Sequence, residues 1–185
     1  MEVEKLVDSI EITGEYLKEM NLMKVDTTLE YFRTVSMHRM VNHYLPKFLI
    51  CLESLDNQMI WDCGDYEKEM NSIGGITLHI IEQVTRNTLR LSNPELKFDK
   101  GIENYFPNMN EEKDQLISRL NLTFSKFRTT LVSVEPDHVD LFNLYHLVEH
   151  TSYHLGQIID RAQKLTGIQY QFVQNGLNEK ELRAL

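Results

Sequence analysis

The stretch Tyr145-His-Leu-Val-Glu-His-Thr-Ser-Tyr-His-Leu-Gly-Gln-Ile158 carries three histidines in successive steps of four residues: His146, His150 and His154. Four residues advance an α-helix by slightly more than one turn, so side chains at this spacing project from one face. Two imidazoles on neighbouring turns can hold a single metal ion, as they do in helices with a His-Glu-x-x-His motif. The stretch therefore predicts a helix, and it makes metal binding the leading hypothesis for the function.

Outside this stretch, apolar residues recur at steps of three and four rather than two, which is typical of helices. Pro46 falls inside the first such segment and predicts a kink or a break near residues 43–45, because proline lacks a backbone donor and crowds the preceding turn. Asn71 and Ser72 are good N-cap residues for the second. Gly167 is a typical C-cap residue for the last helical segment. The pattern predicts an all-α four-helix bundle, with helices over about 28–55, 71–91, 111–131 and 137–165.

Three further segments complete the predicted architecture. An amphipathic pattern with Val3, Leu6, Val7 and Ile10 on one face predicts a short N-terminal helix. Residues 168–172 alternate apolar and polar side chains, so we expect this C-terminal extension to lie extended against the bundle. The connection over 92–110 is long for a bundle, which predicts a crossover or a loop over the site.

Length and charge limit the classes of function. A chain of 185 residues suits one domain, residues 1–185, with a sizeable core. Its formal charge of −9 argues against nucleic-acid binding, which needs a concentrated basic surface. No apolar run is long enough to span a membrane, and the N-terminus carries acids where a signal peptide carries basic residues. Cys51 and Cys63 fit a reducing compartment as free thiols, so we expect a cytoplasmic protein.

Two histidines on one helix leave a metal ion short of ligands, so a third ligand should come from a facing helix. His79 is the best candidate, because it lies beside the apolar stripe of the segment 71–91. His43, near Pro46, competes with it. We expect His38 to be solvated and His138 to lie near a helix start.

Three neutral imidazoles with one open position form a recognised kind of catalytic zinc site, and nickel or ferrous iron also accept imidazole. The second nitrogen of each ligand usually donates to an acceptor, for which Glu82, Glu149 and backbone carbonyls are candidates. Tyr153 and Gln157 are candidates to line the same space. No residue is assigned a catalytic role. The alternative is that these histidines only satisfy hydrogen bonds in the core.

Two sequence blocks, Asn71-Ser-Ile-Gly-Gly-Ile-Thr-Leu-His-Ile80 and His150-Thr-Ser-Tyr-His-Leu-Gly-Gln-Ile158, resemble the paired signatures of the DinB-like superfamily, which includes the YfiT-like metal-dependent hydrolases. The segment 45–55, together with Trp61, resembles the first-helix region of one uncharacterised branch. The resemblance covers about residues 36–166 and leaves both ends of the chain outside it.

The resemblance implies a four-helix bundle with up-down-down-up connectivity, often a homodimer, and a divalent metal ion, zinc or nickel, held by His79, His150 and His154. His146 is not required by that triad. Similar proteins include hydrolases, transferases of bacillithiol and other low-molecular-weight thiols, and mycothiol-dependent isomerases, so a small-molecule substrate is expected. The alternative function is a non-catalytic, dimeric metal-binding or stress-response bundle.

Overall fold

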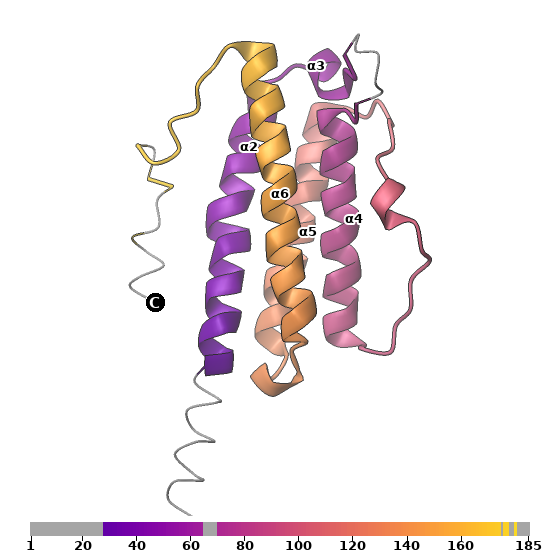
Figure 1. Ribbon diagram of the computed structural model, residues 1–185, viewed down its shortest axis with the longest axis vertical. Helices are drawn as coiled ribbons and strands as arrows, with labels where there is room; N and C mark the ends of the chain where they lie inside the picture. Colours follow the sequence, from indigo (N-terminus) through magenta and orange to yellow (C-terminus); the bar gives the residue numbers. More distant parts are fainter. Residues whose placement is uncertain (1–27, 65–69, 175, 178–179, 181–185) are drawn as a thin grey trace, which may run out of the picture.

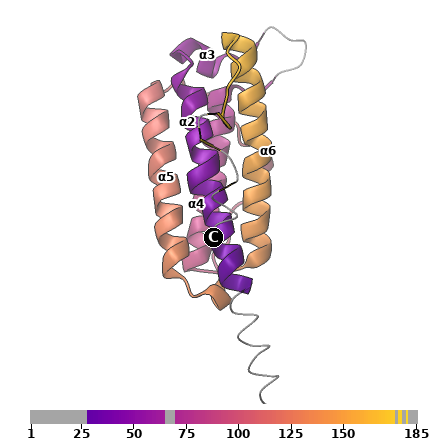
Figure 2. The same cartoon turned by 90° about the vertical axis from the view of Figure 1, so that its left-hand side faces the viewer.

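The computed structural model describes residues 28–64, 70–174, 176–177 and 180. Every regular element in this part of the chain is a helix, and the long helices pack side by side as a bundle (Figures 1 and 2). The predicted all-α bundle is therefore confirmed, whereas the predicted helix around residues 3–10 lies outside the described residues. None of the helices described combines the length and the apolar character that crossing a membrane requires.

The first long helix contains the predicted irregularity before Pro46. Residues 28–38 are α-helical, a π-helical turn η1 (Arg39–Tyr44) follows, and α2 (Leu45–Glu53) continues directly from it. Pro46 lies in the first turn of α2, so its ring falls next to the π-helical turn. A proline ring would crowd the preceding turn of a regular α-helix, and a single wider turn makes room for it. The helix consequently changes its winding near residues 43–45 but does not stop there.

A short helix, α3 (Asn57–Trp61), precedes α4 (Ile73–Ser92), which begins where the N-cap residues predicted. The hydroxyl of Ser72 accepts a hydrogen bond from the backbone N–H of Gly75 at 2.9 Å, which satisfies one of the free donors of the first turn. The ring of Trp61 lies directly against Gly74. The absence of a side chain at Gly74 thus allows the indole to close this end of the bundle.

The helix α5 (Lys113–Ser133) begins two residues later than its periodicity predicted. The carbonyl of Glu111 accepts the indole N–H of Trp61 at 2.9 Å, and Glu112 takes the N-cap position. The predicted apolar stripe is confirmed, since five of its side chains are fully buried: Leu116, Leu120, Phe124, Phe127 and Leu131.

The helix α6 (Leu141–Thr166) carries the three histidines of the opening stretch. Its predicted start near residue 137 is wrong. A 3-10 turn, η3 (Pro136–His138), occupies that position, and Asp140 then caps α6 by accepting the backbone N–H of Asn143 at 3.0 Å. Its predicted end is confirmed, because Gly167 adopts a φ of 70° that favours glycine.

The helices differ in direction (Figures 1 and 2). The helix over 28–53 and α6 run one way along the bundle, whereas α4 and α5 run the other way. Because α4 and α5 are neighbours with the same direction, residues 93–112 must return along the length of the bundle before α5 can begin. This crossover, which includes η2 (Ile102–Asn104), is the long connection that the sequence predicted.

The C-terminal extension packs on the first helix, as predicted. The hydroxyl groups of Tyr170 and Ser54 lie 2.5 Å apart, and the ammonium group of Lys47 lies 5.4 Å from the centre of the Phe172 ring. Tyr170 and Phe172 also stack on each other.

Candidate metal centre

Three histidines from two helices meet inside the bundle. His79 projects from the second turn of α4, and His150 and His154 project from the middle of α6. The Nε2 atom of His150 lies 2.8 Å from the Nε2 atom of His79 and 3.1 Å from that of His154. Zinc–nitrogen bonds of 2.0–2.1 Å at tetrahedral angles place ligand nitrogens about 3.3 Å apart. The two separations from His150 are within about half an ångström of this value, and the ligand atoms of all three rings lie within 4.8 Å of one another, so the group could hold a metal ion.

Hydrogen bonds to the other nitrogens determine which nitrogen of two rings faces the centre. The backbone carbonyl of Tyr105 lies 3.2 Å from Nδ1 of His79, and the amide oxygen of Gln157 lies 2.8 Å from Nδ1 of His154. Both partners are acceptors, so each Nδ1 carries the proton and each Nε2 keeps its lone pair. Gln157 is itself oriented by donating to the hydroxyl of Tyr153 at 3.1 Å. The lone pairs of His79 and His154 thus point to the centre before any ion arrives.

The crossover covers the α4 side of the centre. The ring of Phe106 stacks on the His79 imidazole with ring centres 4.4 Å apart and planes inclined by 14°. A Cβ atom at Gly75 would lie only 3.2 Å from the carbonyl oxygen of Phe106 and 3.3 Å from that of Pro107, so glycine permits this close approach. Arg86 holds the beginning of the crossover by donating to the carbonyl of Asp99 at 2.8 Å.

Burial keeps the imidazoles neutral. Removal from water lowers the pKa of His79 to about 4, with a further contribution from the nearby His154. Burial, followed by the charges of the neighbouring histidines, lowers the pKa of His150 to about 4. Burial also lowers the pKa of His154. At neutral pH all three rings are therefore in the unprotonated form that binds metal ions.

The structure separates the triad from the other candidates. His43 is buried in η1 between Arg39 and Lys47, whose side-chain nitrogens lie 3.5 and 3.4 Å from its ring nitrogens, and it does not belong to the cluster. Glu82 pairs with Arg86 at 2.7 Å instead of accepting from a histidine, and Glu149 is exposed to solvent.

Of the acceptors that the sequence suggested for the ring nitrogens, the backbone carbonyl is therefore the one observed. The amide of Gln157 is the acceptor that sequence reasoning missed. Gln157 lies three residues after His154, on the same helix face, and this spacing is the feature of the sequence from which the contact could have been predicted.

Both cysteines are free thiols, as predicted, but they differ in environment. Cys51 is fully buried, and burial raises the pKa of its thiol to about 12, so it stays protonated. Cys63 is exposed at the rim of a cavity of about 390 Å³ between the start of α4 and the end of α6.

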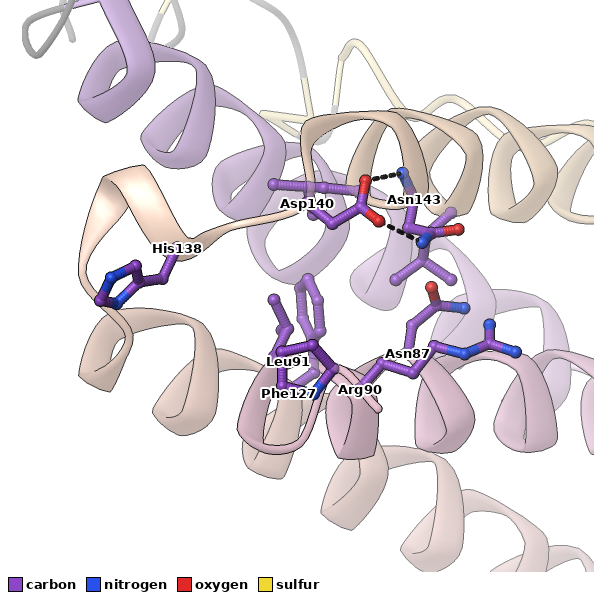
Figure 3. Close-up of a pocket in the computed structure, with 10 residues that line it drawn as sticks. Asn87, Arg90, Leu91, Phe127, His138, Asp140 and Asn143 are labelled. Carbon is purple, nitrogen blue, oxygen red and sulfur yellow. Dashed lines mark hydrogen bonds between the residues drawn. The ribbon is translucent and has the colours of Figure 1, made fainter. Parts of the chain in front are cut away.

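A smaller cavity of about 80 Å³ lies at the opposite end of the same two helices (Figure 3). There Asn87 and Arg90 of α4 face Asp140, the N-cap of α6, and Asn143 in its first turn. His138 lies in the turn just before α6, as predicted, and not in the triad.

Replacing Gln157 with leucine is expected to weaken metal binding about 10- to 100-fold. Leucine cannot accept the Nδ1 proton of His154, so this ring loses the partner that orients it. Competition with a chromogenic chelator would measure the zinc affinity of both proteins. Gln163→Leu is the matched control, because Gln163 lies near the end of α6 and its side chain accepts from the backbone N–H of Tyr170 instead of from a histidine. Equal affinity in the wild-type and Gln157→Leu proteins would contradict an orienting role for the amide.

Comparison with known proteins gives no relative from which to assign this chain: no family model, no curated protein and no solved structure matches it. The class of the protein is therefore defined by its fold and site, as an all-α bundle with a group of three histidines that could hold a metal ion.

Proposed function

We propose that this protein is a metal-dependent enzyme of the DinB-like type, acting on a small molecule as a hydrolase or as a transferase of a low-molecular-weight thiol. The observation that carries the proposal is that the Nε2 atoms of three neutral imidazoles, from two helices, come together at one point. Hydrogen bonds already orient two of the three rings, those of His79 and His154. In a core held only by hydrogen bonds, one Nε2–H of His150 would be the single donor for the two lone pairs of His79 and His154, whereas a metal ion would bind all three nitrogens.

The order and the direction of the helices also support the proposal, because they agree with the connectivity that the sequence resemblance implies. His79, His150 and His154 would hold the ion, with zinc or nickel as the metals that a set of three imidazoles favours. A divalent cation there would favour the deprotonated form of a water or a thiol in the remaining position.

The surroundings of the triad favour the thiol reaction over hydrolysis. Among the described residues, no carboxylate bonds to a ring nitrogen of the triad, and Glu82 is engaged by Arg86. A thiol with an ordinary pKa of about 8.5 loses its proton far more readily than water does, so it depends less on a protein base. A site without an adjacent carboxylate is therefore better suited to a thiol nucleophile.

The cavity beside Cys63 is consistent in size with a small-molecule substrate. Its volume of about 390 Å³ lies in the range of small-molecule sites. It is lined by Ile73 and Asp160, each six residues from a histidine of the triad, which corresponds to about 9 Å along each helix. Its charged lining residues are Arg161 and Lys164 together with Asp62 and Asp160, and Lys164 pairs with Asp160 at 2.7 Å, so the cavity offers groups of both signs to a polar substrate.

The second candidate function is a non-catalytic, dimeric metal-binding bundle. The observation that favours it is a row of exposed aromatic side chains along α6, in which Phe142, Tyr145 and Tyr153 are 78%, 57% and 63% exposed. Exposed aromatic groups on one helix face are typical of protein–protein contacts. A second copy of the chain is the simplest partner for such a face.

A panel of hydrolase and thiol-transfer reactions, run on tag-free protein loaded with zinc or nickel, tests the first function. The His154→Ala protein is the control, since it lacks one proposed ligand. Turnover by the wild-type protein that falls to background in this variant would support an enzyme. Metal uptake without turnover, in a protein that sediments as a dimer, would support the second candidate. Absence of metal uptake would contradict both.

A further inference from the structure

One histidine of the opening stretch has no place in the triad. His146 lies one turn before His150 on α6, with ring centres 5.6 Å apart and planes inclined by 39°. It is close enough to contribute, through its charge, to the lowered pKa of His150. It does not belong to the group of histidines that could hold one ion together. Its side chain is exposed, so packing gives no reason for an imidazole at this position.

The four histidines are graded in depth. His146 is exposed and His150 is partly buried, whereas His154 is 4% exposed and His79 is 1% exposed. On the far side, Phe106 covers the His79 ring. An ion that approaches along α6 therefore meets His146 first, then His150, and reaches the other two rings last.

We propose that His146 is an entry ligand, which captures the metal ion from solvent and passes it to the triad through His150. This inference rests on the proposed metal centre and adds the route by which the ion enters. Imidazoles four residues apart on a helix can hold one ion between them, so His146 and His150 form a transient two-ligand site. The formal charge of −9 favours the approach of cations to this surface.

His150 is suited to the transfer. Among the described residues, its Nδ1 atom has no hydrogen-bond partner, whereas the Nδ1 atoms of His79 and His154 are both bonded. Its ring can therefore turn between His146 and the centre without breaking a bond at Nδ1. Its Nε2 atom already lies 2.8 and 3.1 Å from the Nε2 atoms of the other two ligands. An ion held by His150 is thus next to the remaining ligands.

An entry ligand has a kinetic signature that a structural or coordinating residue lacks. A residue that acts only on the route lowers the barrier in both directions, because binding and release pass through the same intermediate. Its removal therefore slows association and dissociation by the same factor and leaves the equilibrium affinity unchanged. Loss of a ligand of the bound state instead weakens the affinity, mainly through faster dissociation.

The test is stopped-flow measurement of Zn²⁺ association, and of Zn²⁺ release to excess chelator, with tag-free His146→Ala protein. We expect both rates to fall by about tenfold and the affinity to stay unchanged. A tenfold effect is modest compared with what a raised local concentration of a ligand can provide. His138→Ala, which removes another exposed imidazole just before α6, is the matched control and should leave both rates unchanged. His146→Asp keeps a metal-binding side chain and should restore much of the rate.

The outcomes separate this inference from the proposed function. Wild-type binding of Zn²⁺ with unchanged rates in His146→Ala would overturn the entry role and leave the metal centre standing. A weaker affinity in His146→Ala, or two zinc ions bound per wild-type chain, would also overturn it, because His146 would then hold an ion at equilibrium. A wild-type protein that takes up no Zn²⁺ would overturn both.

Discussion

Replacing His150 with alanine is expected to lower the zinc affinity by roughly a hundredfold or more. His150 supplies a nitrogen that lies 2.8 Å from the Nε2 atom of His79 and 3.1 Å from that of His154, so its loss leaves these two rings without the ligand between them. Four-ligand zinc sites contribute about 10–16 kcal/mol, so one ligand accounts for roughly 3 kcal/mol or more, which is about two orders of magnitude in affinity. Chelator competition gives the affinity, and elemental analysis of protein purified without a tag gives the metal content.

The same variant distinguishes a metal centre from a hydrogen-bonded core. If the three histidines only satisfied one another, His150→Ala would change the free energy of unfolding of the metal-free protein and leave the metal content as it was. If they bind an ion, added zinc should stabilise the wild-type protein by an amount that grows with the logarithm of its affinity, and it should stabilise the variant far less. His138→Ala, outside the triad, should behave as the wild-type protein does.

Replacing Gly74 with alanine is expected to destabilise the protein by about 1–3 kcal/mol, although alanine is intrinsically the better helix residue. A Cβ atom at this position would fall 2.5 Å from Cε3 and 2.7 Å from Cη2 of the Trp61 ring, which is too close for any real contact. The indole would have to move, and its hydrogen bond to the carbonyl of Glu111 would be strained or lost. Chemical denaturation measures the cost.

Two controls make this second prediction specific. Gly156 lies in α6, where a Cβ atom would meet no other atom within 4 Å, so Gly156→Ala should stabilise the protein by up to about 1 kcal/mol. In a Trp61→Leu background the cost of Gly74→Ala should shrink, because the two positions are in contact. Trp61 is the single tryptophan of the chain, so its fluorescence reports the displacement directly. Unchanged stability and fluorescence in Gly74→Ala would contradict the packing argument.

The periodicity of apolar residues was sufficient to predict the bundle and its buried stripes, because burial of one helix face depends on local spacing. The helix ends were less well predicted. Residues 111 and 137 looked like helical starts, but Trp61 takes the carbonyl of Glu111, and Asp140 provides a better cap than the turn before it. Each of these helix starts involves a side-chain hydrogen bond, one to a residue three positions away and the other across the fold. The spacing of apolar residues encodes neither of them.

The spacing of four residues by itself determined that His150 and His154 share a helix face, and the apolar stripe around His79 indicated that this ring points inward. Only the tertiary structure brought His79 within 2.8 Å of His150 and placed the carbonyl of Tyr105 and the amide of Gln157 behind the rings. The physical reason is that a helix fixes the positions of its own neighbours through backbone hydrogen bonds. The separation of two helices and the path of a crossover instead depend on packing between segments that are distant in the chain.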